Sequence, residues 1–355
     1  MTQEQAVHEA KLAVAPFELE FVTVGWHKVY GIQQRVAERL VDRENIILAG
    51  DTAHTHSSGT AQGMDVGMHD VVSLGWRLAG VLKGWYPQAV LVNYSDERKA
   101  VAQQLIDNDK VISTLISGQK PESMQDRPED VMTLMNEFMD KTGDFGLGLG
   151  VKYPRVNLLN DGDHAYAGVK IFPGNRALDA LFARPGFRRQ NVRLHEVPKN
   201  NGKFKVMVFV GKPDMTRSAL SGLRAQVDKY KDRHAHAVDF LTIIKGLGLA
   251  FDEPLGMRKF GNAFWDIDSS AHWTYGIADF DGAVVVLRPD GIIGASAPLR
   301  GYEEVVVPYF DRLMLARASV KQAQTIDQRH IGELHVLNPF ENSLTHSRKN
   351  VEVST

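Results

Sequence analysis

The residues best suited to chemistry lie where a short apolar run ends and a helical pattern begins. Residues 45–49 predict a buried strand, and Gly50-Asp51 follows it directly. After a turn rich in serine and glycine, Gln62-Gly63-Met64 opens a stretch with helical spacing. Asp51 could accept hydrogen bonds from ribose-like hydroxyls, and the N–H groups at a helix start favour carbonyl or phosphate oxygens. The spacing therefore indicates a nucleotide or flavin cradle, although an aspartate that only caps a turn fits the same few residues.

A metal site is the second chemistry open to this segment. His54 and His56 lie two residues apart after the strand, so their imidazoles could share a Zn²⁺ ion, with His69 and Asp70 as further ligands. The AGDTAHTH order also resembles metal-dependent amidohydrolases. Because the Gln-Gly-Met helix opening has no role in such a site, we prefer the flavin interpretation, expect no metal, and interpret the two histidines as turn residues.

Other clusters of polar residues have simpler interpretations. His234 and His236 are expected on a solvated helix, where a spacing of two keeps their rings apart. Asp266, Asp268 and His272 are expected in a serine-rich loop, where capping is the common use of such residues. The sequence contains neither a GxSxG nucleophile elbow nor a P-loop.

The cradle needs a long helix and a supporting framework. Apolar residues recur at helical spacing at Met64, Met68, Val71, Leu74, Leu78 and Leu82. Further helices are predicted at residues 32–40, 87–116, 128–139, most of 217–247, and 302–318. Strands are predicted at residues 17–24, 204–210, 283–287 and 292–295. Between the last two strands, Arg288-Pro289-Asp290-Gly291 is a strong turn signal.

The order of residues from 50 to 84 resembles the second flavin fingerprint of the FAD-dependent aromatic hydroxylases of the phenol hydroxylase type. The matching positions are Gly50, Asp51, Ala53, His54, Gln62, Gly63, Met64, Asp70, Leu74, Trp76, Leu82 and Gly84. Residues 148–154 and 275–295 resemble the entry to the last domain of this family and the hairpin that closes it. The resemblance implies an α/β fold in two domains. A partial FAD-binding domain with long helices, like that of p-hydroxybenzoate hydroxylase, covers residues 1–150, and a thioredoxin-like α/β domain covers 151–320. Residues 321–355 are rich in His, Asn and Ser, and we expect them to form a polar tail.

The resemblance also implies which residues bind the cofactor. Asp51 would bind the ribityl chain of FAD, and the flavin ring and its phosphate neighbourhood would be lined by Ala61, Gln62, Gly63, Met64 and Asp65. Two positions depart from the common pattern, because Ser58 replaces a proline and Asp65 replaces an asparagine. An ionised aspartate cannot donate to a flavin carbonyl, so Asp65 is turned away or protonated, or the flavin is bound more weakly.

One expected motif is missing. Family members begin with a βαβ unit that carries GxGxxG for the FAD pyrophosphate, and no segment of this sequence has that spacing before a helix. By resemblance the chain corresponds to the C-terminal half to two-thirds of the usual enzyme. Two hypotheses follow. In the first, the chain is an FAD-dependent monooxygenase that hydroxylates a phenolic substrate with NAD(P)H and O₂, as natural-product tailoring enzymes do. In the second, it is a truncated, non-catalytic homologue or one half of a split enzyme, and it serves as a binding partner.

Composition limits the remaining function classes. The 355 residues contain 41 Lys+Arg and 43 Asp+Glu, which leaves a formal charge of −2 and no general attraction to nucleic acid. With no cysteine, the thioredoxin-like domain cannot perform thiol chemistry, and any redox role needs a cofactor. No apolar run approaches the ~20 residues that span a bilayer. We therefore expect a cytoplasmic protein with an aromatic small-molecule substrate, and the resemblance implies a homodimer through the C-terminal domain.

Overall fold

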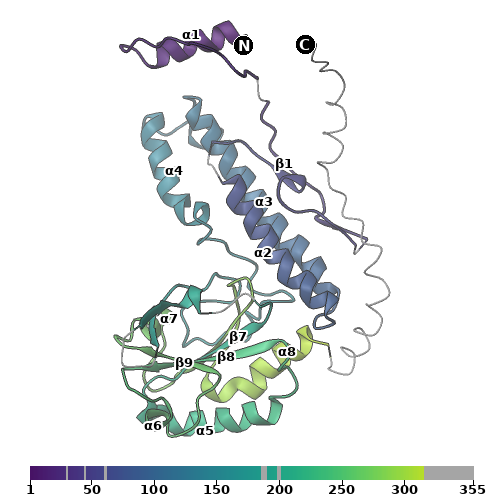
Figure 1. Cartoon of the computed structure of the whole chain (residues 1–355), viewed down its shortest axis with the longest axis vertical. Coiled ribbons are helices and arrows are strands. Elements are labelled where there is room, and N and C mark those ends of the chain that lie inside the picture. Colours follow the sequence, from purple (N-terminus) through teal and green to yellow (C-terminus); the bar gives the residue numbers. More distant parts are fainter. Residues whose placement is uncertain (29–30, 44, 60–61, 185–189, 198–200, 316–355) are drawn as a thin grey trace, which may run out of the picture. The chain divides into compact units, whose positions relative to one another are not determined.

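The computed structural model describes residues 1–28, 31–43, 45–59, 62–184, 190–197 and 201–315. The chain divides into two compact units. The first combines Met1–Val71 with Asp96–Val151, and the second combines Val72–Ser95 with Lys152–Thr355. Two long helices, α2 (Gly63–Leu82) and α3 (Ala89–Ile116), are labelled in Figure 1. Each contributes residues to both units.

The first unit is built from helices and very short strands. Its other helices are α1 (Gln3–Ala13), the 3-10 turns Gly50–Thr52 and Glu122–Met124, and α4 (Val131–Gly146). Strand β1 (Arg35–Val36) pairs antiparallel with β4 (His54–Thr55), and β2 (Val41–Asp42) pairs antiparallel with β3 (Ile46–Ile47). Helix α4 begins where the Asp130 carboxylate accepts the Thr133 N–H, which satisfies one of the unpaired donors of its first turn.

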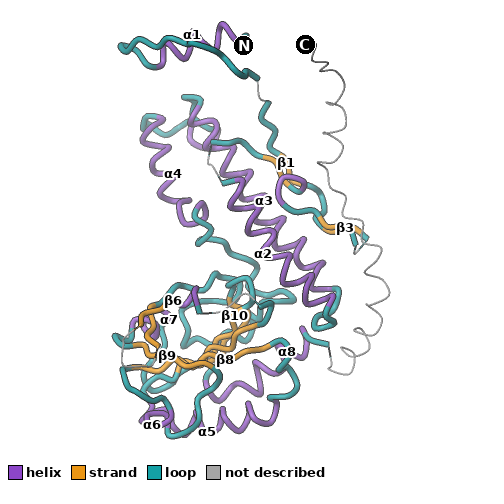
Figure 2. Tube along the Cα trace, in the orientation of Figure 1, coloured by secondary structure: helices purple, strands orange, loops and turns teal. Residues whose placement is uncertain are grey.

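The second unit contains a seven-stranded sheet in the order β11-β10-β7-β8-β9-β5-β6. Strands are coloured orange in Figure 2. The strands are β5 (Leu181–Arg184), β6 (Gln190–Arg193), β7 (Phe204–Phe209), β8 (Val238–Lys245), β9 (Asn262–Asp266), β10 (Ala283–Leu287) and β11 (Ile293–Ala297). The helices are α5 (Pro213–Tyr230), α6 (Asp252–Leu255), α7 (Ser270–Tyr275) and α8 (Val307–Leu313). A parallel β7–α5–β8 unit next to an antiparallel β10–β11 hairpin and a final helix is the arrangement of a thioredoxin-like domain.

Two apolar clusters cover the two faces of this sheet. On β7, Val206 and Val208 belong to one cluster, while Met207 and Phe209 belong to the other. Every residue of β7 is buried, and all of them except Lys205 are apolar, so this central strand does not alternate between apolar and polar residues. The first cluster includes side chains of α5 and α8, and the second includes Tyr275 of α7. The second unit therefore has a core of its own.

Several sequence predictions hold and others are wrong. Helices α2, α3 and α4 and strands β7, β10 and β11 are confirmed, although α4 continues to Gly146. Residues 17–24 form no strand, and residues 32–40 contain β1 instead of a helix. The helix expected over 217–247 ends at Tyr230, and β8 follows it because its apolar residues are buried in the sheet. The polar tail lies outside the described residues, as does the end of the helix predicted at 302–318.

Candidate functional site

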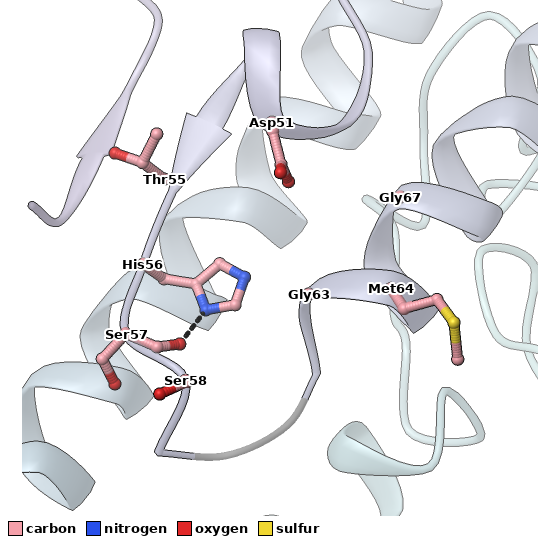
Figure 3. A pocket seen from close by; sticks show the side chains of 8 residues that line it. All are labelled: Asp51, Thr55, His56, Ser57, Ser58, Gly63, Met64 and Gly67. Carbon is pink, nitrogen blue, oxygen red and sulfur yellow. Dashed lines mark hydrogen bonds between the residues drawn. The ribbon is translucent and has the colours of Figure 1, made fainter. Parts of the chain in front are cut away.

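An open pocket of about 540 Å³ lies between the turn that follows residues 46–49 and the start of helix α2 (Figure 3). It is lined by Asp51, Thr55, His56, Ser57, Ser58, Gly63, Met64 and Gly67, all of them in the first unit. Its volume lies within the range of roughly 300 to 1,000 Å³ that is typical of ligand sites. The pocket therefore lies where the sequence placed the cradle.

The structure brings only some of the predicted residues to this pocket. Asp51, Gly63 and Met64 line it, whereas Gln62 and Asp65 are not among its lining residues. Ala61 lies outside the described residues. The Val66 N–H donates to the Gln62 carbonyl in the first turn of α2, so the N–H groups of Gly63, Met64 and Asp65 precede the regular intrahelical pattern. The pocket thus combines the carboxylate of Asp51 with the start of a helix.

His56 occupies one side of the pocket and points toward the start of α2 (Figure 3). Its Nδ1–H donates to the Ser57 carbonyl at 2.6 Å, which directs Nε2 toward Gly63. A Cβ atom added at Gly63 would lie 2.9 Å from that Nε2 and 3.1 Å from Cε1. The absence of a side chain at position 63 is therefore what lets the imidazole lie against the helix.

A buried carboxylate, Asp70, holds one wall of the pocket in place. Its Oδ2 accepts hydrogen bonds from the Gly50 N–H and from His54 Nε2, each at 2.9 Å, and its Oδ1 accepts one from Arg98 Nε at 2.5 Å. Burial alone would raise the pKa of the Asp70 carboxyl, but the hydrogen bond from His54 and the charge of Arg98 outweigh burial and lower it. Gly50 has a φ of 60°, a conformation that favours glycine. Asp70 thereby ties α2 and α3 to the turn before Asp51.

A second buried carboxylate, Asp109 of α3, fixes the other wall. It accepts hydrogen bonds from the Ser57 N–H at 2.7 Å, the Ser57 hydroxyl at 2.5 Å and the Gln34 side chain at 2.7 Å. Sequence reasoning missed Asp109 and Arg98, and it considered Asp70 only as a fingerprint position and a metal ligand. The available signal was helical spacing, because Arg98 lies four residues after Tyr94 and three before Val101, and Asp109 lies four after Leu105 and three before Ile112. A charge on such an apolar helix face is buried only with partners.

The geometry of the histidines does not favour the metal hypothesis. His54 is bound to Asp70 and His56 to Ser57. Across the described residues, no group of three or more histidine, aspartate or glutamate side chains is arranged to hold a metal ion. The histidines of the second unit also differ from prediction: His234 lies in the turns after α5, where it bonds to Asp311 at 2.9 Å.

Residues 266–272, which were expected to form a loop, contain a buried pair of Asp266 and His272. Asp266 ends β9 and accepts the N–H groups of Ala271 and His272, which caps α7. His272 Nδ1 donates to the same carboxylate at 2.7 Å, and its Nε2 accepts the Gly211 N–H at 3.1 Å. Burial lowers the pKa of His272 despite the nearby Asp266. Capping is confirmed for Asp266, and the pair that it forms with His272 is fully buried.

The described part of the chain contains no helix that is both long and apolar enough to cross a lipid bilayer.

Comparison with known proteins gives two domain matches. Residues 1–109 match the family described as FAD binding domain. Residues 234–318 match the phenol hydroxylase C-terminal dimerisation domain. The first match contains the pocket and the second contains the β8–β11 part of the sheet.

Individual relatives agree with these matches. A 3-hydroxybenzoate 4-monooxygenase from Comamonas testosteroni is 27% identical over 356 residues, which cover 89% of this chain and 55% of that protein. A phenol 2-monooxygenase from Aspergillus fumigatus is 26% identical over 349 residues, which cover 91% of this chain and 57% of that protein. Among solved structures, aklavinone-11 hydroxylase in a ternary complex with FAD and aklavinone shares the fold, with a TM-score of 0.56 and 19% identity over 88% of this chain and 51% of that one. The chain spans about half the length of these relatives.

Proposed function

We propose that the chain binds FAD in the pocket at the start of α2. The proposal is supported by the matches of residues 1–109 to the FAD binding domain and of residues 234–318 to the phenol hydroxylase dimerisation domain. The similarity to enzymes named as aromatic monooxygenases also supports it. We further propose that the chain contributes this site to the hydroxylation of a phenolic substrate by NAD(P)H and O₂. Bound FAD would supply the redox chemistry, namely acceptance of hydride and activation of O₂. The single observation that carries the proposal is that Asp51, Gly63 and Met64 line one pocket, within the region that matches the FAD-binding family.

The side chains of the pocket fit this cofactor. An exposed Asp51 carboxylate suits the hydroxyl groups of a ribityl chain, because each hydroxyl can donate a hydrogen bond to it. Gly67 adds no side chain to the pocket wall, and the N–H groups of residues 63–65 suit ring carbonyls. Asp65 is not among the lining residues, so its negative charge need not face the ring. In this account Asp51 and the helix start bind and orient the flavin.

We propose a homodimer formed through residues 234–318, on the basis of the dimerisation-domain match. We place the reaction in the cytoplasm, where NAD(P)H is available. The proposed substrate class is aromatic and phenolic, because the relatives include enzymes named for phenol and 3-hydroxybenzoate. The alternative of a non-catalytic homologue is not favoured by these relatives.

FAD titration of an Asp51 variant tests the proposed site. Asp51→Ala removes the ribityl acceptor, and the dissociation constant for FAD should rise about tenfold, the equivalent of one hydrogen bond to a charged group. Asp163→Ala, which removes an exposed carboxylate of the second unit, is the matched control and should leave the constant unchanged. Equal FAD affinity in the Asp51 variant and the wild type would place the flavin elsewhere.

A further inference from the structure

The turn between β10 and β11 contains a buried carboxylate that joins this hairpin to helix α2. The two oxygens of Asp290 accept hydrogen bonds from Arg288, with Nε–Oδ1 at 3.1 Å and Nη2–Oδ2 at 2.7 Å. Oδ2 also accepts the indole N–H of Trp76 at 3.1 Å and forms an ion pair with Arg77 Nη1 at 3.4 Å. The side chain of Asp290 is only 6% exposed, and those of Arg77 and Arg288 are 0% exposed. We call these four residues the Asp290 clamp.

The Asp290 clamp is itself held firmly on both sides. Arg288 also donates to the Asn160 side chain at 2.8 Å, which fixes the hairpin turn. On α2, Arg77 donates to the carbonyl and the hydroxyl of Ser73 one turn earlier, and its guanidinium lies 4.7 Å from the centre of the Trp76 ring. Burial would raise the pKa of Asp290, but the charges of Arg288 and Arg77 lower it, so the carboxylate remains ionised where water cannot screen it.

Aromatic ring contacts also fix this part of α2 in place. The Trp76 ring meets Tyr86 and Phe204 edge-on, with centroids 5.6 Å away in both cases. Gly80 makes room for Tyr86, because a Cβ atom there would lie 2.0 Å from its ring. Hydrogen bonds, an ion pair and ring contacts therefore all fix α2 at Trp76 and Arg77.

The same helix begins at the pocket. Gly63, Met64 and Gly67 line the pocket, and Trp76 lies roughly 20 Å further along the axis, at about 1.5 Å per residue. Gly67, Gly75 and Gly80 weaken α2 as an isolated helix, since each glycine costs up to about 1 kcal/mol relative to alanine. A helix of this composition depends on tertiary contacts to keep its rotation and its first turn ordered.

We propose that Asp290 is a positioning residue for the flavin pocket, which it orders through helix α2 without touching the cofactor. The proposal rests on the proposed function in one respect, namely that the ordered pocket binds FAD. Fixing Trp76 and Arg77 at one buried carboxylate sets the rotation of α2, and this rotation sets which atoms of Gly63, Met64 and Gly67 face the pocket. A hairpin in the dimerisation domain thereby becomes a determinant of flavin affinity.

Two variants of the clamp and one control test this inference. Asp290→Asn keeps the size of the side chain but removes its charge, and Trp76→Phe removes only the indole donor and part of the ring. Asp239→Asn is the matched control, because Asp239 is an ion-paired carboxylate of the same unit whose partners are Lys203 and Lys205. Near-ultraviolet circular dichroism first confirms that each variant is folded.

Amide hydrogen exchange of residues 63–71 without FAD is the first readout. Exchange should rise several-fold in Asp290→Asn and less in Trp76→Phe, and it should stay at the wild-type rate in Asp239→Asn. The second readout is the dissociation constant for FAD, which should rise about tenfold in Asp290→Asn, in line with the loss of a charge-assisted hydrogen bond. In the Asp290→Asn/Trp76→Phe double variant the two effects on FAD affinity should be less than additive, because both changes act on the same cluster of contacts.

Wild-type exchange rates at residues 63–71 in folded Asp290→Asn would overturn the inference, whatever the FAD result. If Asp290→Asn does not fold, wild-type exchange in Trp76→Phe would overturn it instead. A wild-type chain without FAD affinity, combined with faster exchange in the clamp variants, would contradict the proposed function and support the positioning role. The two failures are therefore distinguishable.

Discussion

Buried charges keep the pocket of the first unit in shape, whereas two apolar clusters pack on either side of a sheet in the second unit. The buried charges of the second unit are found at the Asp290 clamp and the Asp266–His272 pair. Asp70, Arg98 and Asp109 are almost fully buried in the first unit, and large apolar side chains such as Phe17 and Trp26 are 79% exposed there. The second unit buries whole strands, including every residue of β7, β10 and β11. The comparison teaches that the pocket-bearing unit depends on a few polar contacts, each of which is costly to lose.

Removal of the Asp70 carboxylate should have the largest effect. Asp70→Ala leaves Arg98 buried without this partner, and breaking a buried pair in this way costs about 3 to 5 kcal/mol. Leu241→Ala in the second unit should cost about 2 to 5 kcal/mol by opening a cavity. Denaturant unfolding measures both costs, and FAD titration separates them.

At temperatures where both variants are folded, FAD binding should be lost in Asp70→Ala and retained in Leu241→Ala. Equal FAD affinity in the two variants would contradict the contrast between the units.

Lowering the pH should destabilise the second unit first. Burial lowers the pKa of His272 from its ordinary value of 6.5, so the unfolded chain binds a proton at a higher pH than the folded one. Stability contributed by the neutral His272 is therefore present above pH 6.5 and is lost as the pH falls below that value. The pKa of Asp70 lies below its ordinary 3.8, so its contribution is present above pH 3.8 and is lost only in stronger acid.

Thermal unfolding between pH 7.5 and pH 5 tests this order. The wild type should lose stability over this range, and His272→Gln should flatten the slope, with His164→Gln on the surface as the control. Because burial also lowers the pKa of His234, a part of the slope should remain. An unchanged slope in His272→Gln would show that the buried Asp–His pair does not control it.

Two glycines offer a smaller and more local comparison. Gly222→Ala in α5 meets no atom within 4 Å and should stabilise the second unit by up to about 1 kcal/mol. Gly63→Ala places a Cβ atom against His56, so the imidazole must move, and FAD affinity should fall several-fold with little change in stability. Unfolding and FAD titration of both variants measure these effects, and a tighter FAD complex in Gly63→Ala would refute the arrangement in Figure 3.

Exposed ion pairs should matter least in either unit. The first unit has a surface ion-pair group formed by Arg127 with Glu129 and Glu137, and the second has the surface pair Lys229–Glu303. Solvent and salt weaken the attraction between such exposed charges. Replacement of Arg127 or Lys229 by Gln should leave the Tm unchanged within error. A clear drop in Tm for Arg127→Gln alone would reveal that surface charges also support the pocket-bearing unit.

The sequence correctly predicted those elements whose residue pattern fits the environment that they occupy in the fold. Helix α2 has an apolar stripe, and the Arg288-Pro289-Asp290-Gly291 turn has residues that suit its backbone. Strand β8 was missed because it is buried in the sheet, so that its apolar run carries no period-two alternation. Residues 17–24 alternate like a strand, but they have no partner strand in the described structure.

The site was predictable only in part for a related reason. Asp51, Gly63 and Met64 follow from the spacing of one short segment. Asp109 and Asp290 act from elements distant in sequence, on α3 and in the β10–β11 turn, and their partners become visible only in three dimensions. Local sequence shows which residues can face a ligand, but not which distant carboxylates hold them in place.

The most direct test of the account is a visible absorption spectrum of the purified 355-residue chain during titration with FAD. The account predicts saturable binding, with a shift of the flavin bands as the ring enters the pocket at the start of α2. A folded chain whose addition leaves the FAD spectrum unchanged at every concentration would contradict it.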